Sequence, residues 1–174
     1  MFYPRFITLA VVAFMASRVT AQCDDTETTK LLCYEDPDGT PQDVTVADVQ
    51  YVASYLRSYG AQTQAGRQFT QTVANAPDCA EWTLFAHGSV LALGKHIDPT
   101  VNSSVLFSDI ANTIDGGAGA TSAQQAAAII GCATNGGSLG VVYNASNPQY
   151  HTSTYLANDY SPAGVLIKIV NSGA

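Results

Sequence analysis

The cysteines constrain this chain more than any other feature. Cys23, Cys33, Cys79 and Cys132 all follow an apolar N-terminal stretch that is typical of an export signal. An even number of cysteines in an exported chain indicates disulfides. Three pairings are open; we expect Cys79 and Cys132 to be joined to the N-terminal pair, each bond stabilising the fold by about 3–5 kcal/mol. The spacing contains no C-x-x-C, which disfavours a zinc site.

The N-terminus has the three parts of a secretory signal. Arg5 supplies a positive charge, residues 6–16 are mainly apolar, and Val19-Thr20-Ala21 places small residues before Gln22. We therefore predict a signal peptide over residues 1–21 and a single secreted, extracellular domain over residues 22–174. The alternative is an N-terminal membrane anchor. The apolar stretch is short for a membrane span, and no later run of about 18 apolar residues follows, so we predict no membrane span.

The charge balance is acidic. The formal net charge is −7, and cleavage of the signal would remove Arg5 and Arg18 and make it more negative. Such a chain repels phosphate backbones, so nucleic acid is not an expected partner. Solubility alone accounts for an acidic surface in many secreted proteins.

Two sequons mark possible glycosylation sites. They are Asn102-Ser103-Ser104 and Asn144-Ala145-Ser146. We predict N-glycans on Asn102 and Asn144, since a sequon in an exported chain is an acceptor when it lies at the surface. The sequence shows no motif for a cofactor.

The first half of the chain predicts an irregular arm, a helix and a hairpin. The arm covers residues 22–43 and bears two of the cysteines. Apolar residues at helical spacing predict a helix over Val46–Tyr59, with Thr45 as N-cap and Gly60 as stop. Residues 61–78 favour a loop. Glu81–His87 and Val90–Ile97 then predict two strands joined by a Gly88-Ser89 turn.

The second half predicts two further helices and two strands. We expect helices over about 104–115 and 123–130, strands over 139–143 and 164–170, and a long surface loop over 144–163. Helices and strands segregated in this way predict an α+β fold. We expect a mainly antiparallel sheet with helices packed on one face, and disulfides that link the fold.

One motif suggests a nucleophilic serine. Residues 136–140 match G-x-S-x-G, with His151 and Asp159 as possible partners for Ser138. That motif needs a strand before the serine and a helix after it, whereas the sequence here predicts the reverse. We therefore favour a glycine-rich turn that leads into a strand.

Other candidate groups have plain structural explanations. His87 is expected at the hairpin tip and His96 at the end of the return strand, neither with a visible partner. Glu81, Asp78 and Asp98 could form a carboxylate pair for glycoside hydrolysis, but solvated surface acids are the simpler interpretation. Tyrosines in or near the 144–163 segment suit either recognition or ordinary loop packing, and we favour packing. They are Tyr143, Tyr150, Tyr155 and Tyr160.

Three segments carry a resemblance to a known group. Residues 48–60, 82–94 and 104–116 form a helix, a hairpin that begins with Trp82, and a second helix. In this order, behind a signal peptide and in a small acidic chain, they resemble secreted fungal effectors. Within these the chain is weakly similar to the Hce2 and killer-toxin-like α/β-sandwich group. The resemblance implies a non-enzymatic protein that acts on a host or competitor cell, and it carries over no site residue.

Three functions follow as expectations. The first is a secreted effector or toxin-like protein, non-enzymatic and without a cofactor, that modulates virulence, cell death or defence by binding a cell-surface protein or glycan of a host or competitor. The second is a small secreted hydrolase that uses Ser138 or a carboxylate pair. The third is a structural protein of the cell wall or cell surface.

Overall fold

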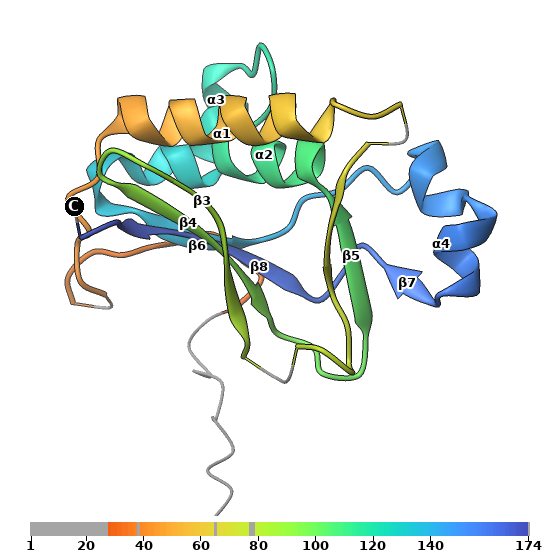
Figure 1. The fold of residues 1–174 in the computed structure, drawn as a ribbon. Coiled ribbons are helices and arrows are strands. Elements are labelled where there is room, and N and C mark those ends of the chain that lie inside the picture. Colours follow the sequence, from red (N-terminus) through yellow and green to blue (C-terminus); the bar gives the residue numbers. More distant parts are fainter. Residues whose placement is uncertain (1–27, 38, 65, 77–78, 174) are drawn as a thin grey trace, which may run out of the picture.

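A computed structural model describes residues 28–37, 39–64, 66–76 and 79–173. The predictions for the signal peptide, Cys23 and Asp78 lie outside these residues. Figure 1 shows α1 (Val46–Gly60) and α2 (Phe107–Asp115) side by side over a twisted sheet. The α+β class is confirmed.

The larger sheet has five strands in the order β1-β6-β8-β4-β3, all antiparallel to their neighbours. The strands are β1 (Leu32–Cys33), β3 (Glu81–His87), β4 (Val90–His96), β6 (Gly137–Gly140) and β8 (Val165–Asn171). The predicted hairpin and the last predicted strand are therefore present. This sheet makes the structure mainly antiparallel, as the sequence predicts.

A second sheet of three strands was not predicted. Its order is β2-β5-β7, from β2 (Gln68–Gln71), β5 (Asn102–Leu106) and β7 (Tyr160–Ser161). The predictions of a loop over 61–78 and of a helix from Ser104 are thus wrong at these strands. Ser103, Ser104 and Val105 are buried and pair with β2, and this long-range pairing overrides the local helical pattern.

The remaining segments are short helices. The third predicted helix is split into α3 (Ser122–Ala126) and the 3-10 segment η1 (Ile129–Asn135). The predicted long loop contains η2 (Pro148–His151) and α4 (Ser153–Ala157). Among the described residues, no helix is long and apolar enough to cross a membrane.

The main core lies between the two long helices and the larger sheet. Most of its fully buried members come from α1, α2, β4 and β8, and they include Val52, Leu56, Ile110, Ile114 and Ile167. The smaller sheet joins this core through Phe69 of β2. A Cβ atom at Gly94 of β4 would lie 2.6 Å from Phe69 Cε1, so only glycine lets the two sheets approach this closely.

The disulfide between Cys33 and Cys132 joins the N-terminal segment to the body of the fold. The two residues are 99 positions apart in sequence, so this bond closes a long loop. Cys79 is also disulfide-bonded. The prediction that Cys132 is joined to one of the two N-terminal cysteines is therefore confirmed.

Candidate binding cleft

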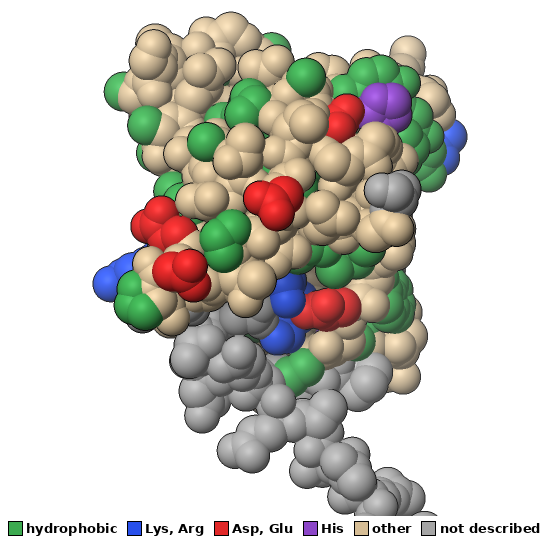
Figure 2. Space-filling view, turned by 90° about the vertical axis from the view of Figure 1, so that its left-hand side faces the viewer, with side chains coloured by type: hydrophobic (Ala, Val, Ile, Leu, Met, Phe, Trp, Pro, Cys, Tyr) green, Lys and Arg blue, Asp and Glu red, His purple; other side chains and the backbone are tan. Residues whose placement is uncertain are grey.

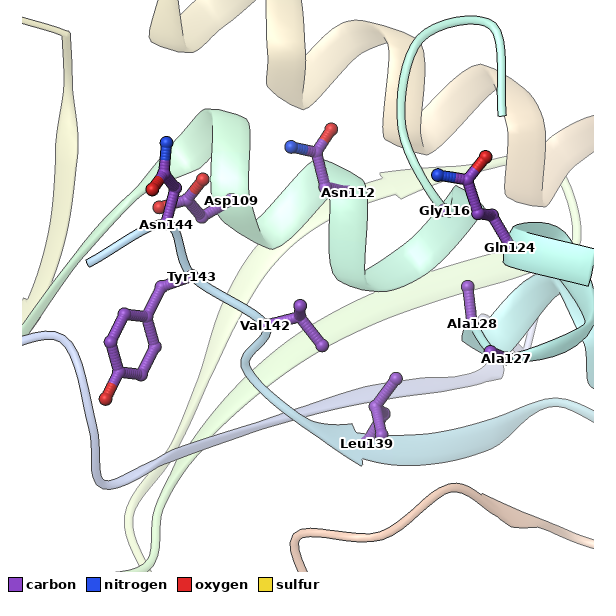
Figure 3. Close-up of a pocket in the computed structure, with 10 residues that line it drawn as sticks. All are labelled: Asp109, Asn112, Gly116, Gln124, Ala127, Ala128, Leu139, Val142, Tyr143 and Asn144. Atoms are coloured by element: carbon purple, nitrogen blue, oxygen red, sulfur yellow. The ribbon is translucent and has the colours of Figure 1, made fainter. Parts of the chain in front are cut away.

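The cleft that we single out lies between α2, α3, β6 and the segment that follows β6 (Figure 3). It has a volume of about 390 Å³, within the range of small-molecule sites. Its polar lining consists of Asp109, Asn112, Gln124 and Asn144. Its apolar lining includes Leu139, Val142, Ala127 and Ala128. Polar groups that converge above an apolar floor are typical of a binding site.

Helix α2 presents two of these polar groups. Asp109 and Asn112 are three residues apart and so lie on the same side of the helix. The helix ends at Gly116, whose left-handed backbone (φ 85°) suits glycine. A Cβ atom at Gly116 would lie 2.9 Å from the Gln124 backbone, so this glycine also lets α3 approach the cleft.

The segment after β6 is held against α2 by Thr113. The Thr113 hydroxyl donates to Asp109 O at 2.8 Å and accepts from Val142 N at 2.8 Å. This pair of bonds fixes the chain that carries Val142, Tyr143 and Asn144. The cleft is therefore preformed by the fold rather than left to a loop without contacts.

Asp109 is the only carboxylate among the described residues that line the cleft, and it is 5% exposed. Its Oδ2 accepts a 2.6 Å hydrogen bond from the Tyr150 hydroxyl, whose oxygen also accepts from Leu106 N at 3.0 Å. Within the described chain, no residue donates to Asp109 Oδ1. That oxygen therefore remains as an acceptor for a ligand.

The side-chain amides of Asn112, Gln124 and Asn144 have fixed orientations. Arg57 Nη2 donates to Asn112 Oδ1 at 3.2 Å, and Ser146 N donates to Asn144 Oδ1 at 3.1 Å. Gln124 Oε1 accepts from Thr121 N at 2.8 Å in a capping box. Each of these donors is an N–H group that cannot accept, so the amide atom facing it must be the oxygen. The NH₂ group of each amide is therefore the other atom, and it makes no hydrogen bond within the described chain.

The sequence did not single out three of these four residues. Asp109 and Asn112 fall inside the helix predicted over about 104–115, and Gln124 falls inside the helix predicted over about 123–130. The one usable signal was Asp109, which directly precedes the buried Ile110 and borders the apolar face of the helix. Asn144 was singled out as a glycosylation site only.

The G-x-S-x-G serine does not form a nucleophilic site. Ser138 lies within β6, paired with Leu32 and Lys168, and it is fully buried. Its hydroxyl makes no hydrogen bond in the described structure, whereas His151 Nε2 contacts Ala145 O at 2.8 Å. The hydrogen bond that a serine–histidine mechanism requires is absent between these described residues.

The other two histidines have structural positions. His96 is fully buried, with Nδ1 2.8 Å from Ala76 O and Nε2 3.0 Å from Val101 O. It thereby joins the chain before β3 to the chain before β5. His87 lies at the end of β3, where its ring stacks on Tyr51 at 3.7 Å between centroids.

The predicted acidic candidates are dispersed, whereas the four tyrosines pack edge to face in a continuous chain. Glu81 Oε1 accepts from Lys168 Nζ at 2.7 Å, and Asp98 accepts from Thr100 in its own turn. Tyr150 and Tyr155 are buried and their rings pack edge to face, as the packing interpretation predicts. In the part of the chain that the structure describes, no group of three or more His, Cys, Asp or Glu side chains is placed to hold a metal ion.

One face of the molecule carries several acidic side chains. Figure 2 shows that some of them lie beside Lys or Arg side chains and others among uncharged groups. Of the predicted glycosylation sites, Asn144 is exposed and Asn102 is half-buried at the start of β5.

Comparisons with protein-family models, curated proteins and solved structures give no match to this chain.

Proposed function

We propose that this chain is a secreted effector or toxin-like protein that acts outside its own cell on a host or competitor cell, by binding and not by catalysis. The cleft between α2, α3 and β6 is the site that binds the target. The supporting observation is its described lining, which combines three side-chain amides, each held by an internal hydrogen bond, with one carboxylate.

This lining suits recognition better than hydrolysis. A glycoside hydrolase needs two carboxyl groups around the scissile bond, and the described lining of the cleft presents only Asp109. Amides are poor proton donors and acceptors for catalysis but good groups for fixing a ligand's orientation.

The test applies purified protein to cells. Protein prepared in a bacterial periplasm, which attaches no glycan to Asn144, is added to leaf tissue and to fungal and bacterial cultures, and viability and defence responses are measured. Ala127→Trp fills the cleft from its exposed rim, and Ala123→Trp is a matched control on the exposed surface of α3. We expect the response to the native protein to persist in Ala123→Trp and to be lost in Ala127→Trp.

Two results would count against the proposal. If the native protein changes no cell type, the effector function is wrong. If both tryptophan variants act as the native protein does, the cleft is not the site. Ser138→Ala should leave the response unchanged, since that hydroxyl is buried away from the cleft.

A further inference from the structure

We infer that the cleft takes a short neutral oligosaccharide. This inference rests on the proposed function, because it names the ligand of the same cleft. It follows from which atoms the lining leaves unused: the NH₂ groups of Asn112, Gln124 and Asn144, and Asp109 Oδ1. The set offers several donors and one charged acceptor.

Sugar hydroxyls match this set. Each hydroxyl both accepts and donates a hydrogen bond, so one ring accepts from the amides and donates to the carboxylate. A carboxylate that accepts from a hydroxyl makes a charge-assisted bond, which is stronger than a neutral one. A ligand with acceptors only would leave Asp109 Oδ1 without a donor, at a cost in affinity.

The floor of the cleft suits the other side of a sugar ring. Leu139, Val142 and Ala128 supply apolar contact for the C–H groups of a pyranose. Figure 3 shows these side chains on the side of the cleft opposite the amides of α2 and α3. Tyr143 lies at the end of the cleft near Asn144, and its ring is positioned edge to face against Tyr150.

Charge excludes acidic sugars. Asp109 lies inside the cleft, and the whole chain has a net charge of −7. A uronic acid would place a second negative charge close to the carboxylate, which is unfavourable in a partly buried site. Neutral sugars carry no such penalty.

Size favours a short glycan over a folded partner. A volume of about 390 Å³ accepts a small molecule or the end of a chain, whereas protein interfaces are broad surfaces. The ligand is therefore a free oligosaccharide or the exposed end of a surface glycan, which share this chemistry.

Four isosteric substitutions test the assignment. Asn112→Asp, Gln124→Glu and Asn144→Asp each keep the oxygen that accepts the internal hydrogen bond and replace the NH₂ donor with an oxygen. Asp109→Asn keeps an oxygen for Tyr150 and replaces the free acceptor with a donor. Asn147→Asp is the matched control: Asn147 Oδ1 likewise accepts, from Gln149 N at 3.0 Å, but this residue does not line the cleft.

A glycan on Asn144 would occupy the amide that this assignment uses, so the assignment replaces the predicted glycan at that position. The protein is made in a bacterial periplasm, which forms disulfides and attaches no glycan to Asn144. Titration calorimetry then uses neutral trisaccharides of N-acetylglucosamine, glucose and mannose, with trigalacturonate and a glucosamine trimer as charged probes. We expect at least one neutral trisaccharide to bind, and each cleft substitution to weaken it by about tenfold or more. Asn147→Asp should change its affinity less than about twofold, and trigalacturonate should not bind. Circular dichroism confirms that each variant is folded.

Three outcomes would overturn the inference: no neutral trisaccharide binds, binding survives all four cleft substitutions, or the glucosamine trimer binds more tightly than its N-acetylated form. The last would indicate a cationic ligand. The cell assay separates this failure from that of the proposed function. If Ala127→Trp abolishes a cell response but no neutral sugar binds, the proposed function stands and the neutral oligosaccharide is the wrong ligand. If a neutral sugar binds but no cell responds, the ligand assignment stands and the proposed function is wrong.

Discussion

The Tyr150 hydroxyl donates a 2.6 Å hydrogen bond to Asp109 Oδ2, and it links the segment after β6 to the wall of the cleft. The two residues are 41 positions apart in sequence. Because the same hydroxyl accepts from Leu106 N, one side chain satisfies both a buried carboxylate oxygen and a buried backbone donor.

Removal of this hydroxyl should destabilise the protein. We expect Tyr150→Phe to lower the free energy of unfolding by about 1–3 kcal/mol, because Leu106 N and Asp109 both lose a buried partner. Tyr160→Phe is the control, since the Tyr160 hydroxyl makes no hydrogen bond within the described chain. Urea unfolding measures both variants. Equal midpoints for the two would show that the Tyr150 bond contributes nothing.

Alkaline pH should act through the same cluster. Burial, and for Tyr150 also the bond to Asp109, raises the pKa of the phenols of Tyr150 and Tyr155 far above their ordinary value of 10.0. A raised pKa in the folded state gives stability that is complete below about pH 10 and is lost as the pH rises beyond it. Tyrosinate absorbance and circular dichroism are followed together. We expect the last phenols to ionise only as the fold is lost; full ionisation of a folded protein would contradict this.

Acid should release the contact between α1 and the hairpin turn. Hydrogen bonds from Ser89 N and Ser89 Oγ, at 3.0 and 2.8 Å, lower the pKa of Asp48 from 3.8 to about 2. A lowered pKa gives stability that is present above about pH 4 and is lost as the pH falls toward 2. Unfolding midpoints between pH 5 and pH 2 should fall less steeply for Asp48→Asn than for the native protein. A native slope in Asp48→Asn would refute the role of this carboxylate.

The Cys33–Cys132 disulfide should account for a large share of the stability. In the chain-entropy model, closing a loop of 99 residues restricts the unfolded chain by about 4–5 kcal/mol. The double variant Cys33→Ser/Cys132→Ser should therefore lose about 3–5 kcal/mol, a large fraction of the usual 5–15 kcal/mol of a domain. Calorimetry measures the midpoint temperature of unfolding of the native protein and of the double variant. Equal midpoint temperatures would contradict the prediction.

Local patterns predicted the elements that depend on local contacts. The helix from Val46 begins at its expected N-cap Thr45, and the hairpin turns at Gly88-Ser89. The smaller sheet was missed because Gln68–Gln71 has no strand-like alternation of its own and is ordered by pairing with β5. The apolar run that contains Leu106 was assigned to a helix, although the helix begins only at Phe107.

The cleft was missed for a related reason. Asp109, Gln124 and Asn144 are far apart in sequence, and each has an ordinary local explanation as a helix or turn residue. The hydrogen bonds that fix Gln124 and Asn144 are local turn and cap bonds, and only the bond between Asp109 and Tyr150 joins distant parts of the chain. What marks the three residues is that the fold brings them to one cleft. The sequence did point to Ser138, but that residue is buried in a strand and paired on both sides.

The most direct measurement is an NMR titration of ¹⁵N-labelled protein with the neutral trisaccharides. It follows the side-chain NH₂ signals of Asn112, Gln124, Asn144 and the control Asn147. We expect the first three signals to shift together with one dissociation constant while the Asn147 signal stays in place. If a trisaccharide binds and these three signals do not move, the cleft is not the site; if no trisaccharide moves any of them, the cleft does not bind neutral glycans.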